Sequence, residues 1–176
     1  MPQSKETFLF DEILKLSKKN NVHIIYLKNG DIVKIDDVLF EVLYPTEDTQ
    51  NLDLNNSSMI IKVKANDTSI LFTGDAEKEE ETLLIKEFNK LKLDADILKV
   101  GHHGSKTSSS LQFLNIVTPY ISVISCGVDN KFKHPNDETI NKLNVINSKI
   151  YRTDLSGEIS LKIYKNNKIK IQTAIL

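Results

Sequence analysis

The chain has 176 residues, a normal size for one domain, and 40% of them are hydrophobic, which is enough to build a core. A formal net charge of −1 and a pI near 6.4 argue against a dedicated nucleic-acid binder, because such domains usually carry a strong basic excess. The single cysteine, Cys126, excludes an internal disulfide, and no apolar run approaches the ~18–20 residues that span a bilayer.

The first third of the chain predicts one helix followed by short strands. Apolar residues at helical spacing predict an amphipathic helix over residues 7–19. Asn29-Gly30 and Asp36-Asp37 mark turns, and Asn-Gly is a strong hairpin signal because both residues tolerate positive φ. The β-type runs lie at residues 22–26, 32–35, 38–44, 59–64 and 69–73, with a polar loop over 45–56.

The remainder predicts helices that alternate with strands. Residues 77–91 carry one apolar face and are predicted to be a helix. Its acids Glu79, Glu80 and Glu81 are interpreted as a solvated run that matches the helix dipole. Further strands are predicted at 97–100, 121–125, 149–152, 158–164 and 168–173, and further helices at 109–117 and 136–146. This alternation, with hairpins at both ends, indicates a layered α/β domain.

Asp75 is the first candidate for chemistry, because it follows the apolar run 70–72 and precedes a helix. A carboxylate at this place could bind a metal or bridge two of them. The alternative is that Asp75 caps the helix that begins near Glu77, a role that aspartate fills well.

The pair His102-His103 directly follows the predicted strand 97–100. One histidine can face a site while the other packs or bonds to it. The following residues, 105–110, supply hydroxyls and helix-start amides that could hold an anion, and helix capping is their alternative role. The candidate substrate-binding residues in this stretch are Ser105, Thr107 and Ser108.

His134 completes the group. Pro135 restricts its backbone, which suits a fixed ligand and equally suits the start of an ordinary helix. Asp75, the His102-His103 pair and His134 all come just after a strand, and α/β sheets build their sites at the carboxyl ends of strands. Imidazole and carboxylate suit Zn²⁺, and less well Mn²⁺ or Fe. The sequence therefore predicts a metal site, whereas His23 receives no function and Cys126 is expected to be a buried small hydrophobe.

Four segments carry a family resemblance: LFTGDAEKEEETLLIKEF, DADILKVGHHGSKTSSSLQFL, VISCGVDNKFKHPNDETINKL and IYRTDLSGEI. They resemble the metallo-β-lactamase-fold domain of ComEC-type competence (DNA-uptake) proteins and of related free-standing hydrolases. The likeness is dense over about residues 38–161. The stretch 55–58, Asn-Asn-Ser-Ser, also resembles the family's Asn-rich approach to its hairpin.

The resemblance implies a four-layered αββα sandwich with metal at one edge of its two sheets. Residues 1–176 would form a single, incomplete domain of this α/β type that lacks the N-terminal part. By position, Asp75 matches the family's second-half metal-binding aspartate, and His102, His103 and His134 match histidines near the site. The implied roles are metal ligation for all four residues, with His102 or His103 alternatively donating a proton to the leaving group. The implied cofactor is Zn²⁺ or Mn²⁺.

One family motif is not found in this sequence. The string His-x-His-x-Asp-His normally lies upstream, and the only histidine before His102 is His23. A catalytic zinc normally needs three protein ligands and an open position. We therefore expect little or no hydrolase activity and a metal that this chain does not necessarily retain. A truncated gene product, a split gene and an excised fragment are the origins that this pattern suggests.

Two functions from different classes follow. The first is a metal-dependent hydrolase, or a piece of one, that acts on a phosphodiester or similar ester, including incoming DNA in competence. The second is a non-catalytic remnant that self-associates or docks with a partner supplying the missing half. The chain shows no membrane segment and no signal peptide, so the expected location is cytoplasmic if free-standing and membrane-associated within a competence protein.

Overall fold

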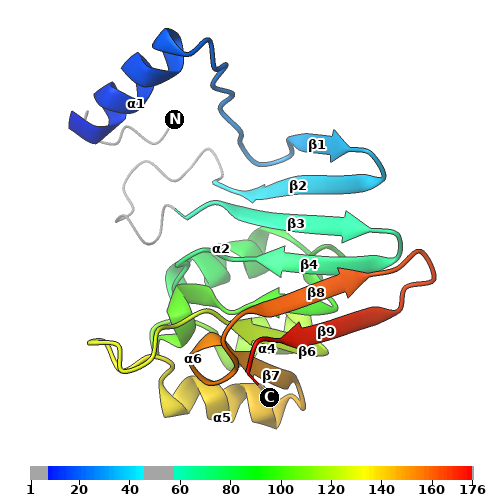
Figure 1. Cartoon of the computed structure of the whole chain (residues 1–176). Coiled ribbons are helices and arrows are strands. Elements are labelled where there is room, and N and C mark those ends of the chain that lie inside the picture. Colours follow the sequence, from blue (N-terminus) through cyan, green and yellow to red (C-terminus); the bar gives the residue numbers. More distant parts are fainter. Residues whose placement is uncertain (1–7, 46–57, 176) are drawn as a thin grey trace.

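The computed structural model describes residues 8–45 and 58–175. The predicted polar loop beyond Pro45 and the asparagines at 55–56 lie outside the described residues. The fold has three layers, with helices on one face of a large sheet and a two-stranded hairpin on the other (Figure 1). The prediction of an α/β domain built as a partial αββα sandwich is therefore confirmed.

The large sheet has seven strands whose spatial order follows the chain. These strands are β1 (Ile32–Ile35), β2 (Val38–Tyr44), β3 (Ile60–Ala65), β4 (Thr68–Phe72), β5 (Ile97–Lys99), β6 (Ile121–Ile124) and β7 (Lys149–Arg152). The hairpin consists of β8 (Ile159–Ile163) and β9 (Ile169–Thr173). The helices are α1 (Phe8–Lys19), α2 (Lys78–Glu87), α3 (Lys90–Leu93), α4 (Leu111–Val117), α5 (Asp137–Val145) and α6 (Thr153–Ser156), with a 3-10 turn at Gly101–Gly104.

The type of strand pairing changes once across the sheet, from antiparallel to parallel at β4. Strands β1 to β4 pair antiparallel, and the pairs β4–β5, β5–β6 and β6–β7 are parallel. Two-residue turns join β1 to β2 and β3 to β4, and Asp36 and Asn66 adopt the positive φ that such turns require. Because β4 to β7 are parallel, their carboxyl ends share one edge of the sheet, and the segments that follow them meet there.

The main core lies between the sheet and its helices. Leu71, Leu98 and Ile124 point from β4, β5 and β6 toward this layer, and all three are fully buried. The helices contribute Leu84, Phe113 and Leu143 to the same cluster, again without exposed surface above 1%. Burial of each such side chain contributes about 1.5–3 kcal/mol, so this layer fixes β4 to β6 and the edge that they form.

The opposite face is covered over β5 and β6. Ile97 and Ile121 alternate with the core residues and are nevertheless buried. The β8–β9 hairpin lies over this face (Figure 1). Its turn is bonded to the β3–β4 turn, with Asp67 N donating to Asn167 Oδ1 at 3.1 Å and Asn66 Nδ2 to the main-chain oxygen of Tyr164 at 3.3 Å.

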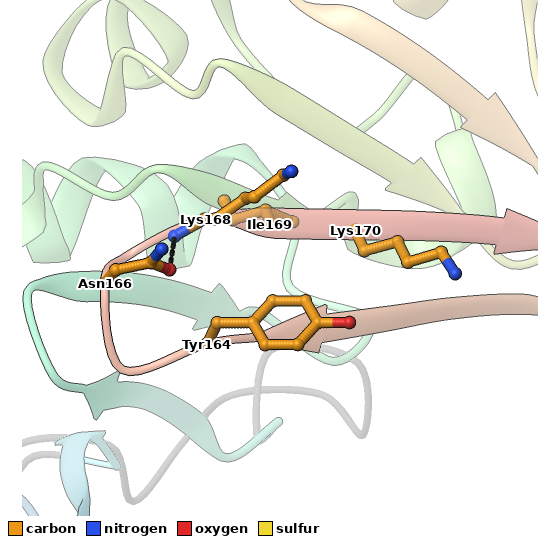
Figure 2. Close-up of a pocket in the computed structure, with 5 residues that line it drawn as sticks. All are labelled: Tyr164, Asn166, Lys168, Ile169 and Lys170. Atoms are coloured by element: carbon orange, nitrogen blue, oxygen red, sulfur yellow. Dashed lines mark hydrogen bonds between the residues drawn. The ribbon is translucent and has the colours of Figure 1, made fainter.

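A hollow of about 360 Å³ lies at the tip of this hairpin, and Figure 2 shows the side chains around it. They are Tyr164, Asn166, Lys168, Ile169 and Lys170. The hairpin tip contacts the start of β4, so the hollow lies at the edge opposite the carboxyl ends of the parallel strands. None of the predicted site residues lines it.

The N-terminal part is little buried. All four residues of β1 are exposed, and β2 is its only partner strand among the residues described. Helix α1 has no buried residue and stands apart from the sheet (Figure 1). Its Phe8 is 83% exposed. No helix within residues 8–45 and 58–175 has the length and apolar character to cross a membrane.

Three sequence-based expectations were wrong. Residues 22–26 form no strand and are exposed, because no strand of the described chain pairs with them. Helix α2 ends at Glu87, since Phe88 is extended and the Asn89 side chain caps a new helix, α3. The acidic run is not solvated throughout: Glu80 and Glu81 are buried.

Candidate metal centre

The sheet edge brings the four predicted metal-binding residues together. Asp75 follows β4, His102 and His103 lie in the 3-10 turn after β5, and His134 lies in the loop after β6. The ring centroids of His102 and His103 are 6.4 Å apart, and those of His102 and His134 are 5.8 Å apart. His103 Nε2 lies 3.5 Å from Asp75 Oδ1. The four side chains therefore lie at one edge of the sheet, as expected from their positions after strands.

His103 is oriented by a main-chain carbonyl. Its Nδ1 lies 2.7 Å from the oxygen of Ser125, at the end of β6. A carbonyl can only accept a hydrogen bond, so Nδ1 carries a proton, and in the neutral ring Nε2 is then the nitrogen that keeps its lone pair. Nε2 faces the Asp75 carboxylate. Two ligands of one tetrahedral zinc, each bound at about 2.0–2.2 Å, lie about 3.4 Å apart, so the pair fits a single ion.

His102 points to a different carboxylate. Its Nδ1 lies 2.9 Å from Glu77 Oε1, within ion-pair distance although not aligned for a hydrogen bond. Thr107 Oγ1 donates to the same Glu77 oxygen at 2.8 Å. Both side chains of the pair are largely buried, with 23% and 18% of their surface exposed. Glu77 thus holds one side of the His102 ring.

Neighbouring histidines diverge because the turn is left-handed. His102 has φ 44°, His103 has φ 54° and Gly104 has φ 82°. The left-handed conformation costs about 1–2 kcal/mol for a residue with a Cβ, so the surrounding contacts must stabilise it. His102 N donates to the oxygen of Gly74 at 3.1 Å, and Asn136 N donates to that of Gly104 at 2.9 Å. These bonds tie together the loops after β4, β5 and β6.

His134 is held by its own loop. Asn130 Oδ1 accepts from His134 N at 2.9 Å, and Asn130 Nδ2 donates to His134 O at 2.6 Å. The His134 ring stacks on Phe132, with centroids 5.8 Å apart and planes 15° apart. Its Nδ1 is buried and has no hydrogen-bond partner among the residues that the structure describes. Burial lowers the pKa of His134, and His102 and His103 lower it further. The neutral ring is therefore favoured, as a metal ligand requires.

Asp75 does not cap helix α2. The N-cap residue of α2 is Glu77, whose side chain makes no capping hydrogen bond. The main-chain N–H of Asp75 donates instead to Ser58 Oγ at 2.9 Å. The capping interpretation of Asp75 is thus wrong. Lys99 Nζ lies beside it and donates to the oxygen of Gly74 at 3.1 Å. Burial lowers the pKa of Lys99, and the Asp75 carboxylate opposes that shift.

The hydroxyl-rich loop satisfies its own polar groups. Ser108 is fully buried, and its Oγ donates to the oxygen of Gly101 at 2.9 Å. Ser105 is buried, and its Oγ lies 2.9 Å from Thr107 Oγ1. These bonds hold the shape of the turn that carries the two histidines.

The helix-start amides of this loop are engaged by a buried carboxylate. Glu81 accepts from the main-chain N–H groups of Ser109 and Ser110, the latter at 2.8 Å. Burial raises the pKa of Glu81, and these amide bonds oppose the shift. Ser110 also caps α4, because its side chain accepts from Phe113 N. An internal anion thus holds the amides for which the sequence suggested an external one.

Sequence reasoning missed two partners of the histidines, Glu77 and the carbonyl of Ser125. Glu77 carried a signal, since it lies two residues after Asp75 and on the same edge. Ser125 carried none, because every residue has a carbonyl. Within the described ranges, no group of three or more His, Cys, Asp or Glu side chains is arranged to hold an ion. The Asp75–His103 pair fits two ligands, and the ring of His134 lies next to that of His102.

Comparison with known proteins adds a family and several relatives. A family model described as the metallo-beta-lactamase superfamily matches residues 2–128. ComE operon protein 3 of Bacillus subtilis is 36% identical over 156 residues, which cover 89% of this chain and 20% of that protein. Competence protein ComA of Neisseria gonorrhoeae is 40% identical over 124 residues, or 70% of this chain and 18% of that protein. Recombination protein 2 of Haemophilus influenzae is 34% identical over 135 residues, or 77% and 16%. The chain thus spans about a fifth of the length of these relatives.

Proposed function

The chain belongs to the metallo-β-lactamase superfamily, and from that premise we propose that its strand-end side chains form part of a metal-dependent phosphodiester hydrolase centre. The observation that supports this most directly is the 3.5 Å approach of His103 Nε2 to Asp75 Oδ1. In the neutral ring, Nε2 and the carboxylate oxygen both offer lone pairs at this distance, so a cation bound by both atoms would relieve their repulsion. Members of this superfamily commonly bind Zn²⁺, and the pair has the spacing of two zinc ligands.

The residues divide the work. Asp75 and His103 hold the ion, and Ser125 keeps the His103 ring in the ligating tautomer. A divalent cation bound there supplies Lewis acidity and lowers the pKa of a water toward about 7. His102, whose far ring nitrogen is held by Glu77, donates a proton to the leaving group.

The chain by itself has few ligands. A catalytic zinc normally has three protein ligands, and centres with two metals need more. Asp75 and His103 supply two, and His134 lies at the same edge of the sheet, but no three such side chains of the described residues are arranged to hold one ion. We therefore expect the 176-residue chain to bind Zn²⁺ or Mn²⁺ weakly and to turn over substrate slowly. Groups from outside this chain would complete the centre.

The relatives suggest a biological setting. One is named a competence protein, one is named for the ComE operon and one for recombination. We propose that the phosphodiester is that of incoming DNA, and that the domain works close to a membrane when it belongs to a competence protein.

Metal titration of the purified chain tests the proposal. Isothermal titration with Zn²⁺, and the visible absorption of bound Co²⁺, should show one site that Asp75→Asn and His103→Gln each remove. His23→Gln is the matched control, because it exchanges the same residue types away from the sheet edge. Hydrolysis of bis-nitrophenyl phosphate with added Zn²⁺ or Mn²⁺ should be slow. The proposal is wrong if wild-type chain binds neither ion, or if rapid turnover survives Asp75→Asn.

The second candidate is a docking module without catalysis. The exposed apolar residues of β1, including Ile32 and Ile35 at 61% and 58% exposure, favour it. An exposed strand edge with apolar side chains promotes pairing with another chain. Size-exclusion chromatography should then show self-association that Ile35→Lys reduces. A clean monomer across a wide concentration range would contradict this function.

A further inference from the structure

The end of strand β6 is clamped by a side chain that follows the neighbouring strand, β7. Cys126 N donates to Thr153 Oγ1 at 2.8 Å, and Thr153 Oγ1 donates back to the oxygen of Cys126 at 2.7 Å. A single hydroxyl can make both bonds, because it has one O–H and two lone pairs. The clamp thus satisfies both main-chain groups of one residue across 27 positions of sequence.

A second bond strengthens the same connection. Cys126 Sγ donates to Asp154 Oδ1 at 3.2 Å. Arg152 Nε and Nη2 bind the two oxygens of that carboxylate at 3.1 and 2.6 Å. The hydrogen bond from Arg152 lowers the pKa of Asp154, so the carboxylate stays charged and remains an acceptor. The segment 152–154 therefore forms a rigid anchor for Cys126.

The clamped residue is directly attached to the group that orients His103. Ser125 precedes Cys126, and its carbonyl accepts from His103 Nδ1 at 2.7 Å. A shift of Cys126 would move that carbonyl and weaken the bond that keeps the proton on Nδ1. The ring could then carry its proton on Nε2, and a protonated Nε2 cannot bind a metal.

We propose that Thr153 is a positioning residue for the metal centre, and that its hydroxyl fixes the Ser125 carbonyl and through it the tautomer of His103. The role of the tautomer in metal binding rests on the proposed function, whereas the effect on the ring itself does not. Loss of such outer partners of a metal-binding histidine typically costs 10–100-fold in metal affinity.

The test compares Thr153→Val with Thr153→Ser. Valine removes the hydroxyl, and serine keeps it. In the metal-free chain at about pH 8, two-dimensional ¹H–¹⁵N NMR of the imidazoles reports which nitrogen of His103 is protonated. Wild type and Thr153→Ser should show the proton on Nδ1, and Thr153→Val should show a substantial Nε2–H population. Zn²⁺ affinity should fall about 10–100-fold in Thr153→Val and recover in Thr153→Ser.

Ser122→Ala controls for general destabilisation. Ser122 is fully buried on β6, and its Oγ lies 2.7 Å from Ser148 Oγ, which precedes β7. The substitution Ser122→Ala therefore removes a hydroxyl contact between β6 and the start of β7, at the end of these strands opposite Thr153. The proposal is overturned if Thr153→Val keeps the wild-type tautomer, if Ser122→Ala shifts it equally, or if Thr153→Ser does not restore it. If the wild-type chain binds no Zn²⁺ while Thr153→Val still changes the tautomer and Thr153→Ser restores it, only the proposed hydrolase function is rejected.

Discussion

Gly104 lies where two loops of the centre touch, and its replacement by alanine tests that contact. The residue has φ 82°, and a Cβ built on it would lie 2.6 Å from Pro135 Cβ and 3.4 Å from Ile124 Cγ2. The left-handed conformation costs alanine about 1–2 kcal/mol. Relief of the overlap with Pro135 adds about 1–3 kcal/mol, as in other overpacked cores. We expect Gly104→Ala to lower the free energy of unfolding by about 2–5 kcal/mol in total.

Gly30→Ala separates the two contributions. Gly30 also has a left-handed backbone, with φ 88°, but a Cβ there would meet no atom within 4 Å. Gly30→Ala should therefore cost only the conformational part, about 1–2 kcal/mol. Urea unfolding followed by circular dichroism gives both free energies by linear extrapolation. The difference between the two variants measures the contact with Pro135.

The same pair of variants links packing to the metal centre. Pro135 directly follows His134, so Gly104→Ala should also move the NMR signals of the His134 ring, and Gly30→Ala should leave them in place. Equal unfolding free energies for the two variants, or an unmoved His134 signal in Gly104→Ala, would refute the reasoning.

Two further predictions concern the histidines. Glu77→Ala removes the carboxylate that accepts from Thr107 Oγ1 and lies beside His102 Nδ1, so it should lower the free energy of unfolding in urea by about 1–3 kcal/mol. Exposed Glu79→Ala should change that free energy by less than about 0.5 kcal/mol, and equal effects would contradict the assigned contacts. The pKa of His134, read by NMR titration, should lie below its ordinary 6.5 and should rise in His102→Gln, because burial and the neighbouring rings oppose its charge. Since the folded-state pKa of His134 is depressed, the stability that the neutral ring contributes is present above about pH 6.5 and is lost as pH falls through the folded-state pKa. A His134 titration midpoint that does not change in His102→Gln would contradict the cause given.

Much of the fold follows from local patterns in the sequence. The antiparallel strands were predictable because they are short β-type runs, and two-residue turns separate β1 from β2 and β3 from β4. The grouping of Asp75 with the three histidines was predictable from their common place after a strand, since parallel strands end at one edge. Neither inference needs a contact between distant side chains.

The errors arose where a distant partner decides the outcome. Residues 22–26 have the composition of a strand, but a strand forms only if another one pairs with it. From the local sequence, Glu81 is expected to be a solvated acid. In the fold, the main-chain amides of Ser109 and Ser110, 28 or more residues away, donate hydrogen bonds to its carboxylate. The Glu77–His102 contact is of the same kind, because it joins two loops that only the sheet brings together.

The left-handed turn at His102 and His103 gives neighbouring residues two separate destinations, Glu77 for one ring and Asp75 for the other. Under the proposed function the doublet is therefore not a duplicated ligand, because its two rings face different carboxylates. A homologue that has lost the first histidine and one that has lost the second have lost different capabilities. Comparative surveys of this family should score the two losses as distinct evolutionary events.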